Sequence, residues 1–299
     1  MRLRWFWVLL PVVLGTILAL ILFLTDFDNS LLYAQADLGS ILFGLGVIAS
    51  ILTAVVIIVL EQIEKIQINA TIEFAENRRR FLRRLDHELK NPLTAILAGL
   101  ANLSILEDPD ERAVTLESVS TQVDRMRKLV AELRKLSELE TRPLDLSPVK
   151  MTELLEETFA LIEDEPVARE RILTLSIPRA PWPLPTISGD YDLLVLAVHN
   201  LLTNAVKFTE PGDTIEMRAF EDGSQVVIEV ADTGPGIPES EIPYVWQELY
   251  RGAGARGVQG SGLGLALVRA IVTRHEGEIT LRSRPNEGTV FTMRLPVRM

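Results

Sequence analysis

The segment Asp-His-Glu-Leu-Lys-Asn-Pro-Leu-Thr, residues 86–94, places a histidine beside a carboxylate. A neutral imidazole is a good nucleophile near pH 7, and a carboxylate can hold its other nitrogen in the required tautomer. His87 is two positions from both Leu85 and Leu89, so on a helix it points away from their apolar face. Pro92 lacks a backbone N–H and is expected to bend that helix beneath the histidine. The segment is a candidate nucleophile site, although an exposed histidine next to a glutamate is usually an ordinary surface feature.

The segment His199–Phe208 places two amides and a lysine on one face of a predicted helix. Asn200, Asn204 and Lys207 stand at positions i, i+4 and i+7, among apolar neighbours. An amide oxygen is a hard ligand that suits Mg²⁺, and a lysine ammonium suits phosphate oxygens. Considered alone, the same residues are equally compatible with a capping and surface role.

Three glycine-containing segments follow along the chain. Residues 232–237, Asp-Thr-Gly-Pro-Gly-Ile, put an acid at a strand end, where it can accept a hydrogen bond from an adenine amino group. Residues 260–265, Gly-Ser-Gly-Leu-Gly-Leu, directly precede a predicted helix, and such backbone binds anions. They do not follow a strand, as a Rossmann loop does. Residues 232–237, and residues 286–289 (Asn-Glu-Gly-Thr), are also compatible with plain turns.

Two amphipathic helices must position the histidine. Apolar residues at steps of three or four predict one helix from Glu61 to about Glu107 and a second to about Glu140. The break at residues 108–110, Asp-Pro-Asp, is short, so the helices should form an antiparallel pair. Because one hairpin cannot bury both apolar seams, the pattern predicts a dimer forming a four-helix bundle. The seam residues are Phe81, Leu85, Leu89, Leu93, Ile96, Leu100, Leu103, Val119, Val123, Met126, Val130, Leu133 and Leu136.

After a linker marked by Thr141-Arg142-Pro143 and Ser147-Pro148, strand-like and helix-like stretches alternate. This alternation predicts an α+β sandwich of one sheet against helices. Asp190 suits the N-cap of the first predicted helix. The predicted strands are 172–177, 214–220, 226–231, 278–282 and 289–295, and the predicted helices are 191–208 and 263–275.

The composition excludes several kinds of site. The 299 residues are enough for about two domains. A net charge of −11 argues against nucleic acid as a partner, because phosphate binding needs a basic face. The chain has no cysteine, which excludes disulfides, thiolate metal sites and cysteine nucleophiles.

Two uncharged apolar stretches, residues 5–24 and 38–60, are long enough to cross a bilayer as helices. Arg2 and Arg4 precede the first stretch, and three aspartates lie between the two. The positive-inside rule therefore places the N-terminus in the cytoplasm, and two crossings return residues 61–299 to it.

The segment between the two stretches, about residues 25–37, is too short to fold into a ligand-binding domain. An alternative for the first stretch is a signal peptide cleaved after the small-x-small site Ala34-Gln35-Ala36. That site lies far beyond the end of the apolar run, and the run is longer than a usual signal core. These two observations favour a retained membrane helix.

Taken together, the motifs resemble those of a known family. His87-Glu88 with Asn91-Pro92-Leu93-Thr94 resembles the phospho-acceptor motif of bacterial two-component sensor histidine kinases, and Asn200 to Phe208 resembles their asparagine box. The two longer glycine-containing segments resemble the two glycine boxes, and Gly288-Thr289 resembles the last box. The motifs occur in family order and at family-like spacing, over about three quarters of the chain.

The resemblance implies a fold and an activity. It implies an ATP-binding domain of the histidine kinase and gyrase type, shared with a heat-shock chaperone. Members of the family autophosphorylate the histidine and pass the phosphoryl group to an aspartate on a response regulator. By resemblance, His87 is the acceptor, Glu88 activates it, and Asn91 positions a water for dephosphorylating the regulator.

The resemblance also implies the binding residues for ATP and Mg²⁺. Asn204 would hold Mg²⁺, Asn200 and Lys207 would contact phosphates, and Asp232 would read adenine. The other expected ATP-binding residues are Gly234, Gly236, Tyr250, Arg251, Gly260, Gly262, Leu263, Gly264 and Thr289.

The implied organisation has four parts in an inner-membrane protein of two spans. These are a membrane anchor (1–60), a linking helix (61–76), a dimerisation and histidine phosphotransfer domain (77–142) and a catalytic ATP-binding domain (147–299). Only 26 residues, 61–86, separate the second span from His87. The signal is therefore expected to be read in or beside the membrane, and an accessory membrane protein is one candidate for supplying it.

One segment departs from the family pattern. Residues 245–251, Val-Trp-Gln-Glu-Leu-Tyr-Arg, stand where the family has a Phe-Glu-Arg-Phe-Tyr-Arg type of sequence, which changes the segment expected to close over the nucleotide. This departure supports an alternative, a membrane-anchored pseudokinase scaffold that binds nucleotide without phosphotransfer. An unrelated ATPase of the same fold is a third possibility, and the exposed histidine helix argues against it.

Overall fold

The structure, a computed structural model, describes residues 2–24, 38–180, 182–255, 257–258 and 260–297. It divides into two compact units, Met1–Arg80 and Phe81–Met299. The predicted segment at 25–37, including the possible cleavage site, lies outside the described residues.

The first unit consists of α1 (Arg2–Leu24) and the first part of α2 (Leu38–Leu103). The two helices approach closely at glycines, because a Cβ on Gly46 would lie 2.8 Å from the carbonyl oxygen of Pro11. Among the described residues, one helical stretch is long and apolar enough to cross a membrane, Ser40–Asn69, and a shorter apolar stretch lies at Leu10–Ile21. The second predicted span is therefore supported by length and composition, and the first stays a prediction.

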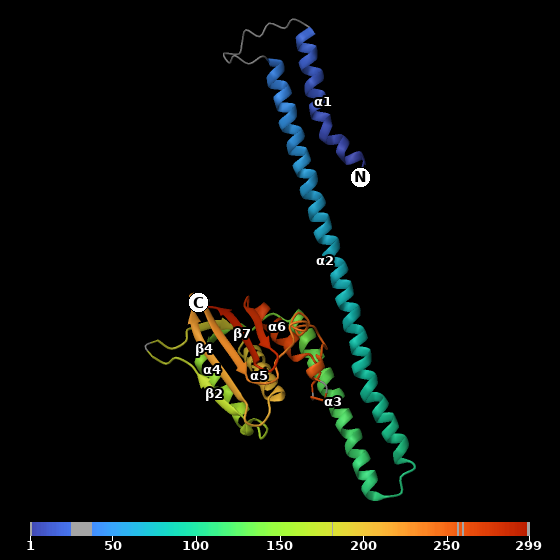
Figure 1. The fold of residues 1–299 in the computed structure, drawn as a ribbon, viewed down its shortest axis with the longest axis vertical. Coiled ribbons are helices and arrows are strands. Elements are labelled where there is room, and N and C mark those ends of the chain that lie inside the picture. The colour runs from blue at the N-terminus through green and yellow to red at the C-terminus, as the bar shows by residue number, and fades with distance from the viewer. Residues whose placement is uncertain (1, 25–37, 181, 256, 259, 298–299) are drawn as a thin grey trace. The chain divides into compact units, whose positions relative to one another are not determined.

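The second unit begins with an antiparallel hairpin of the last part of α2 and α3 (Pro109–Thr141), drawn in green tones in Figure 1. The Asp108 side chain caps α3 by accepting the backbone N–H of Asp110 at 2.9 Å. A break between the two helices is therefore confirmed, but it lies at residues 104–108: α2 ends about four residues earlier than predicted, and Pro109 and Asp110 begin α3. Helix α2 continues through Pro92, which is buried, so the bend expected there stays a prediction.

A five-stranded sheet and three helices, α4, α5 and α6, form most of the rest of this unit (Figure 1). The sheet order is β2-β4-β5-β7-β6, with β2 and β4 parallel and the other pairs antiparallel. The strands are β2 (Ile172–Ser176), β4 (Thr214–Asp222), β5 (Gln225–Asp232), β6 (Glu278–Arg284) and β7 (Gly288–Pro296). The long helices are α4 (Met151–Glu163), α5 (Tyr191–Phe208) and α6 (Gly264–Arg274), and two short 3-10 turns are η1 (Ala168–Glu170) and η2 (Ala253–Ala255).

One apolar core lies between these helices and the sheet. In β4, alternate residues Ile215, Met217 and Ala219 are buried, as expected for a strand with one face against helices. On α5 the buried residues recur at helical spacing. The predicted sandwich of one sheet against helices is therefore confirmed.

The linker prediction was wrong at its second half. Ser147-Pro148 begins β1 (Ser147–Lys150), which pairs antiparallel with β3 (Thr186–Gly189) in a separate two-stranded sheet. Helix α4 follows β1 at once and was not predicted. A proline at the start of an edge strand needs no ladder N–H, which is why Pro148 is compatible with this short pair.

Candidate functional site

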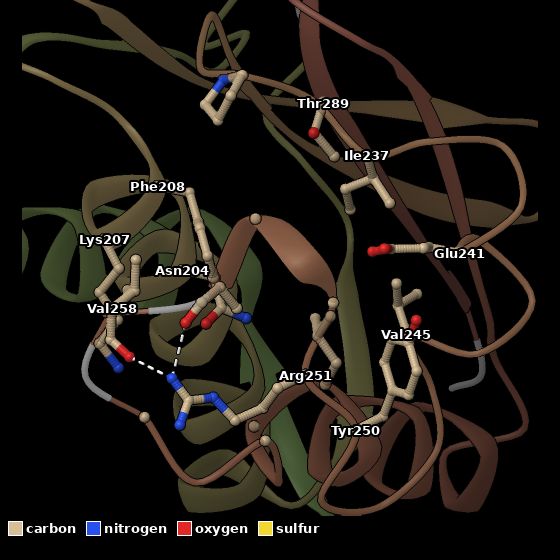
Figure 2. Close-up of a pocket in the computed structure, with 18 of the residues that line it drawn as sticks. Asn204, Lys207, Phe208, Ile237, Glu241, Val245, Tyr250, Arg251, Val258 and Thr289 are labelled. Carbon is tan, nitrogen blue, oxygen red and sulfur yellow. Dashed lines mark hydrogen bonds between the residues drawn. The ribbon is translucent and has the colours of Figure 1, made fainter.

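A cavity of about 220 Å³ lies beside α5, and the three polar residues of that helix line it. Asn200, Asn204 and Lys207 are brought together as their spacing predicted, because Asp190 caps α5 through the N–H of Leu193 and fixes where the helix begins. Figure 2 shows Asn204, Lys207 and Phe208 along one side of the cavity, and Ile237, Glu241 and Val245 along the other side.

Asp232 lies at the end of β5 and also lines the cavity. Its Oδ1 accepts the N–H of Gly234 at 3.0 Å, and the backbone N–H of Thr289 also donates to the carboxylate. Burial raises the pKa of Asp232 to about 6, against the lowering effect of these two amides. The group can therefore change protonation state just below neutral pH.

The glycines after Asp232 are required by close backbone contacts. A Cβ on Gly234 would lie 2.6 Å from the carbonyl oxygen of Phe208. Gly236 has a φ of +68°, and its Cβ would lie 2.0 Å from the carbonyl oxygen of Arg284. The loop that begins at Asp232 is thus held against α5 on one side and the β6–β7 turn on the other.

The second glycine segment leads directly into α6, as predicted. Gly262 has a φ of +77°, and a Cβ there would lie 2.7 Å from the carbonyl oxygen of Tyr250. A Cβ on Gly264 would lie 3.1 Å from Oδ1 of Asn200. The α6 N-terminus, whose amides form an anion site, is therefore next to the amide side chains of α5.

Tyr250 and Arg251 line the same cavity. Arg251 Nη2 donates to the carbonyl oxygens of Ala255, at 2.7 Å, and Val258, at 2.6 Å (Figure 2). Arg251 thus links the end of η2 to Val258. Burial raises the pKa of the Tyr250 phenol, so the phenol stays neutral and able to donate a hydrogen bond.

Most of the predicted nucleotide-binding residues line the cavity, and two do not. Gly234 is packed against the backbone of Phe208 and does not line the cavity. The Leu263 side chain is buried in an apolar cluster outside the cavity. Fourteen further lining residues were missed, among them Glu132, Phe208, Ile237, Glu241, Val245, Ser261 and Phe291. Phe208 and Ile237 belong to the quoted segments and could have been included, whereas Glu132 lies among many similar surface acids and carries no sequence signal.

The candidate nucleophile is separate from the cavity. His87 is exposed on α2 and is not among the lining residues. Its neighbour Glu88 is 19% exposed, and the Glu88 carboxylate accepts from Arg125 Nη2 of α3 at 3.0 Å. Asn91, one turn further along α2, is also exposed. The hairpin thus presents His87 and Asn91 to solvent and fixes the Glu88 carboxylate against α3.

The other two histidines have structural surroundings. His275 is buried, and its Nε2 accepts the N–H of Asp190 at 2.9 Å, so its Nδ1 is the atom that donates to the carbonyl oxygen of Ile271. His199 is half-buried beside Thr203, and burial lowers its pKa. Neither residue lines the cavity.

Comparison with known proteins agrees with this geometry. Residues 77–142 match the model of the His Kinase A (phospho-acceptor) domain. Residues 189–299 match the model of the histidine kinase-, DNA gyrase B-, and HSP90-like ATPases. The two matched ranges together take up more than half of the chain. The chain belongs to the two-component sensor histidine kinases.

Individual relatives support the same assignment. The chain is 32% identical over 235 residues to the sensor histidine kinase YclK of Bacillus subtilis, a match that covers 76% of this chain and 48% of YclK. The structure of full-length ShkA in complex with AMPPNP matches with a TM-score of 0.52 and 28% identity, over 72% of this chain and 45% of ShkA.

A third match shows the fold alone. The complex of histidine kinase ThkA with response regulator protein TrrA has a TM-score of 0.61 and 22% identity, over 73% of this chain and 61% of that chain. The chain spans about half the length of YclK and of ShkA.

Proposed function

We propose that this chain is a membrane-anchored sensor histidine kinase that transfers the γ-phosphoryl group of ATP to His87 and then to an aspartate of a response regulator. In this proposal residues 1–60 anchor the protein in the membrane, and residues 61–76 form a helix that links this anchor to the rest of the chain. Residues 77–142 form the dimer and carry the acceptor histidine, and residues 147–299 bind ATP. The observation that carries the proposal is the convergence of α5, the end of β5 and the glycine loop on one cavity, combined with a separate exposed histidine.

The residues of the cavity suit ATP. Asp232 can accept the adenine amino hydrogen, while Lys207 and the amides at the α6 N-terminus suit phosphates. The AMPPNP complex of the relative ShkA supports this assignment. The lining also fits Mg²⁺, because the Asn204 amide oxygen is a hard donor that would hold the ion together with nucleotide phosphates. Bound Mg²⁺ would neutralise phosphate charge.

The proposed transfer is an in-line displacement. An imidazole nitrogen of His87 attacks the γ-phosphorus, the bond to the β–γ bridging oxygen breaks, and ADP leaves with that electron pair. The proton lost from the imidazole passes to the Glu88 carboxylate. Arg125, paired with Glu88, holds that carboxylate on the hairpin.

The second partner is a response regulator. The ThkA–TrrA complex supports a regulator as the partner of this fold. After His87 has passed on its phosphoryl group, Asn91 would orient a water for hydrolysis of the regulator's aspartyl phosphate. Its exposed position on the same helix is compatible with that role.

The assembly proposed is a homodimer in the inner membrane, with two spans per chain and the catalytic part in the cytoplasm. Exposed apolar residues on the hairpin support a second copy as the covering partner. They are Leu93, Leu97, Leu100, Leu116, Val123 and Val130. An accessory membrane protein is proposed as one source of the signal.

Incubation of the full-length protein, in detergent, with γ-labelled ATP and Mg²⁺ tests the proposed function. We expect label that is lost in acid and retained in alkali, as phosphohistidine is. His87→Gln and Asn204→Ala should each abolish the label, and the former should still bind nucleotide. Label that persists in His87→Gln would overturn the assignment of the acceptor. Nucleotide binding without any label, in membranes as well as in detergent, would favour the pseudokinase scaffold.

A further inference from the structure

One wall of the nucleotide cavity comes from the histidine hairpin. Glu132 of α3 lines the cavity together with Asn204 and Lys207. The Ser261 hydroxyl, in the glycine loop, donates a hydrogen bond to the Glu132 carboxylate. Ser261 Oγ in turn accepts the backbone N–H of Leu263 at 3.1 Å. The Ser261 hydroxyl thus connects the Glu132 carboxylate to the backbone amide of Leu263, at the α6 N-terminus, where a phosphate is expected to bind.

Apolar packing holds the hairpin at this position. Leu249 and Leu263 of the ATP-binding domain are 3% and 1% exposed, and both pack against Leu129 of α3, which is 4% exposed. The other residues of this cluster come from both helices of the hairpin: Phe81, Leu85, Leu89, Leu133 and Leu136. Part of the seam that the sequence assigned to the dimer is therefore covered by the ATP-binding domain of the same chain.

A cation from α2 reinforces the contact. Arg84 Nη2 donates to Gln247 Oε1 at 3.0 Å, and Nη1 donates to the carbonyl oxygen of Glu248 at 3.1 Å. The Arg84 guanidinium also lies 5.2 Å from the centre of the Tyr250 ring. Between these partners, Leu249 has a φ of +56°, a conformation that costs energy for a branched side chain. The segment that departs from the family pattern is the segment that docks on the hairpin.

The ATP-binding domain contacts the hairpin at a point too far along the helices from His87 for phosphoryl transfer to that residue. Arg125 pairs with Glu88 and so marks the level of His87 on α3. Glu132 is seven residues further along α3, which is two helical turns, or about 10 Å. The phosphate end of the cavity therefore faces the hairpin away from the acceptor, and His87 stays exposed.

We propose that Glu132 is an acidic gate that competes with the phosphates of ATP and holds the ATP-binding domain in a docked, inactive position. The Glu132 carboxylate and a bound polyphosphate would repel each other inside one cavity, so the cavity favours either the docked Glu132 or bound ATP. By linkage, ATP weakens the docking as much as the docking weakens ATP binding. This proposal rests on the proposed function, because it assigns a regulator to the same ATP site.

Nucleotide titrations of the full-length protein in detergent test the gate, with adenosine, ADP and a non-hydrolysable ATP analogue in the presence of Mg²⁺. Glu132→Gln should lower the Kd for the ATP analogue about three- to tenfold, lower that for ADP less, and leave that for adenosine unchanged. The difference should shrink as salt is raised, because it is electrostatic. The matched control is Glu117→Gln, an exposed glutamate on the same helix, which should leave all three constants unchanged.

A second variant loosens the docking without changing the gate. Arg84→Ala removes the contacts to Gln247 and Glu248, so it should also tighten binding of the ATP analogue. Because both variants act on one docked state, Glu132→Gln combined with Arg84→Ala should give less than the product of the single effects. An additive result would contradict a shared docked state.

The outcomes separate the gate from the proposed function. Failure of the wild-type protein to bind the ATP analogue, or normal binding by Asn204→Ala, would overturn the ATP site itself. Binding that is lost in Asn204→Ala but unchanged in Glu132→Gln would overturn the gate alone. Weaker binding in Glu132→Gln, relieved by more Mg²⁺, would replace the gate with a metal-ligand role. Equal changes for adenosine and the ATP analogue would indicate a general structural effect and would also reject the gate.

Discussion

At the scale of single residues, Asp232 shows how the fold changes the chemistry of a side chain. Its carboxylate is removed from water, and burial outweighs the two backbone amides that stabilise the charged form. An acid at the end of a predicted strand could be selected from the sequence as a base reader. Its raised pKa could not, because the desolvation comes from the cavity walls, which are contributed by segments distant in sequence.

Asp232→Asn should stabilise the nucleotide-free protein at neutral pH. The folded-state pKa of about 6 lies above the unfolded value of 3.8, so the ionised group costs stability at pH values above about 6. That cost falls as the pH drops through 6, because the folded state then binds a proton. In thermal melts we expect the variant to melt a few degrees higher than wild type at pH 7.5, and the gap to be smaller at pH 5.

The control for this prediction is Glu239→Gln, an exposed acid a few residues further along the chain. Its difference from wild type should not depend on pH in the same way. A gap for Asp232→Asn that is constant between pH 5 and pH 7.5 would contradict the burial argument. The same variant should lose binding of adenosine as well as of ATP, because Asp232 is placed at the base and not at the phosphates.

At the scale of elements, local signals were enough where one segment defines its own structure. Asp190 and its hydrogen bond to Leu193 fix the start of α5, and a two-residue turn at Gly223 and Ser224 joins β4 to β5. The short pair of β1 and β3 was not predicted, because its strands are separated by α4 and β2 and stabilise each other only after folding. A strand of four residues carries too little periodicity to be recognised alone.

The hairpin shows a second limit of sequence patterns. The apolar stripes correctly indicated that one face of each helix is covered, but a stripe does not identify what covers it. Leu85 and Leu133 pack with Leu249 and Leu263 of the ATP-binding domain, while Leu97 and other apolar residues of the same helices are exposed. A single hairpin therefore offers two apolar faces: one packs against its own ATP-binding domain, and the other is exposed and is the face that the proposed second copy would cover.

The ion pair that joins the two helices of the hairpin predicts a positioning role for Arg125. Arg125→Ala leaves the Glu88 carboxylate, which is 19% exposed, without the guanidinium that fixes its direction. We expect the maximal rate of autophosphorylation to fall about tenfold while the KM for ATP stays unchanged, because Arg125 does not line the cavity.

Arg125→Lys provides the matched comparison, since it keeps the charge and loses the planar fork. Arg125→Lys should restore part of the autophosphorylation rate. Arg125→Ala should melt at the same temperature as wild type, so that a loss of stability does not explain its lower rate. An unchanged rate, or a rise in KM without a fall in the maximal rate, would show that Arg125 is only a structural residue.

At the scale of the whole molecule, the proposed activity depends on where each part of the chain lies relative to the membrane. The described residues contain one helix that is clearly long and apolar enough to span it, so the number of crossings is the assumption with the widest consequences. A single crossing after a cleaved leader would leave the ATP-binding domain in the cytoplasm as well. With two retained spans, residues 1–24 stay in the mature protein and its N-terminus lies in the cytoplasm. With a cleaved leader, residues 1–24 are removed and the mature N-terminus lies outside the cytoplasm.

The absence of cysteine makes this topology directly measurable, because any introduced thiol is the only one in the chain. With two retained spans, Ser30→Cys should react with a membrane-impermeant maleimide once that reagent reaches the outer face of the inner membrane. Thr121→Cys, exposed on α3, should react only after the inner membrane is opened. The control is the cysteine-free wild type, which should not react at all. An N-terminal tag should also persist in the mature protein. Loss of the tag would indicate a cleaved leader, and protection of Ser30→Cys with the tag retained would contradict two crossings, because the positive-inside rule places that segment outside the cytoplasm.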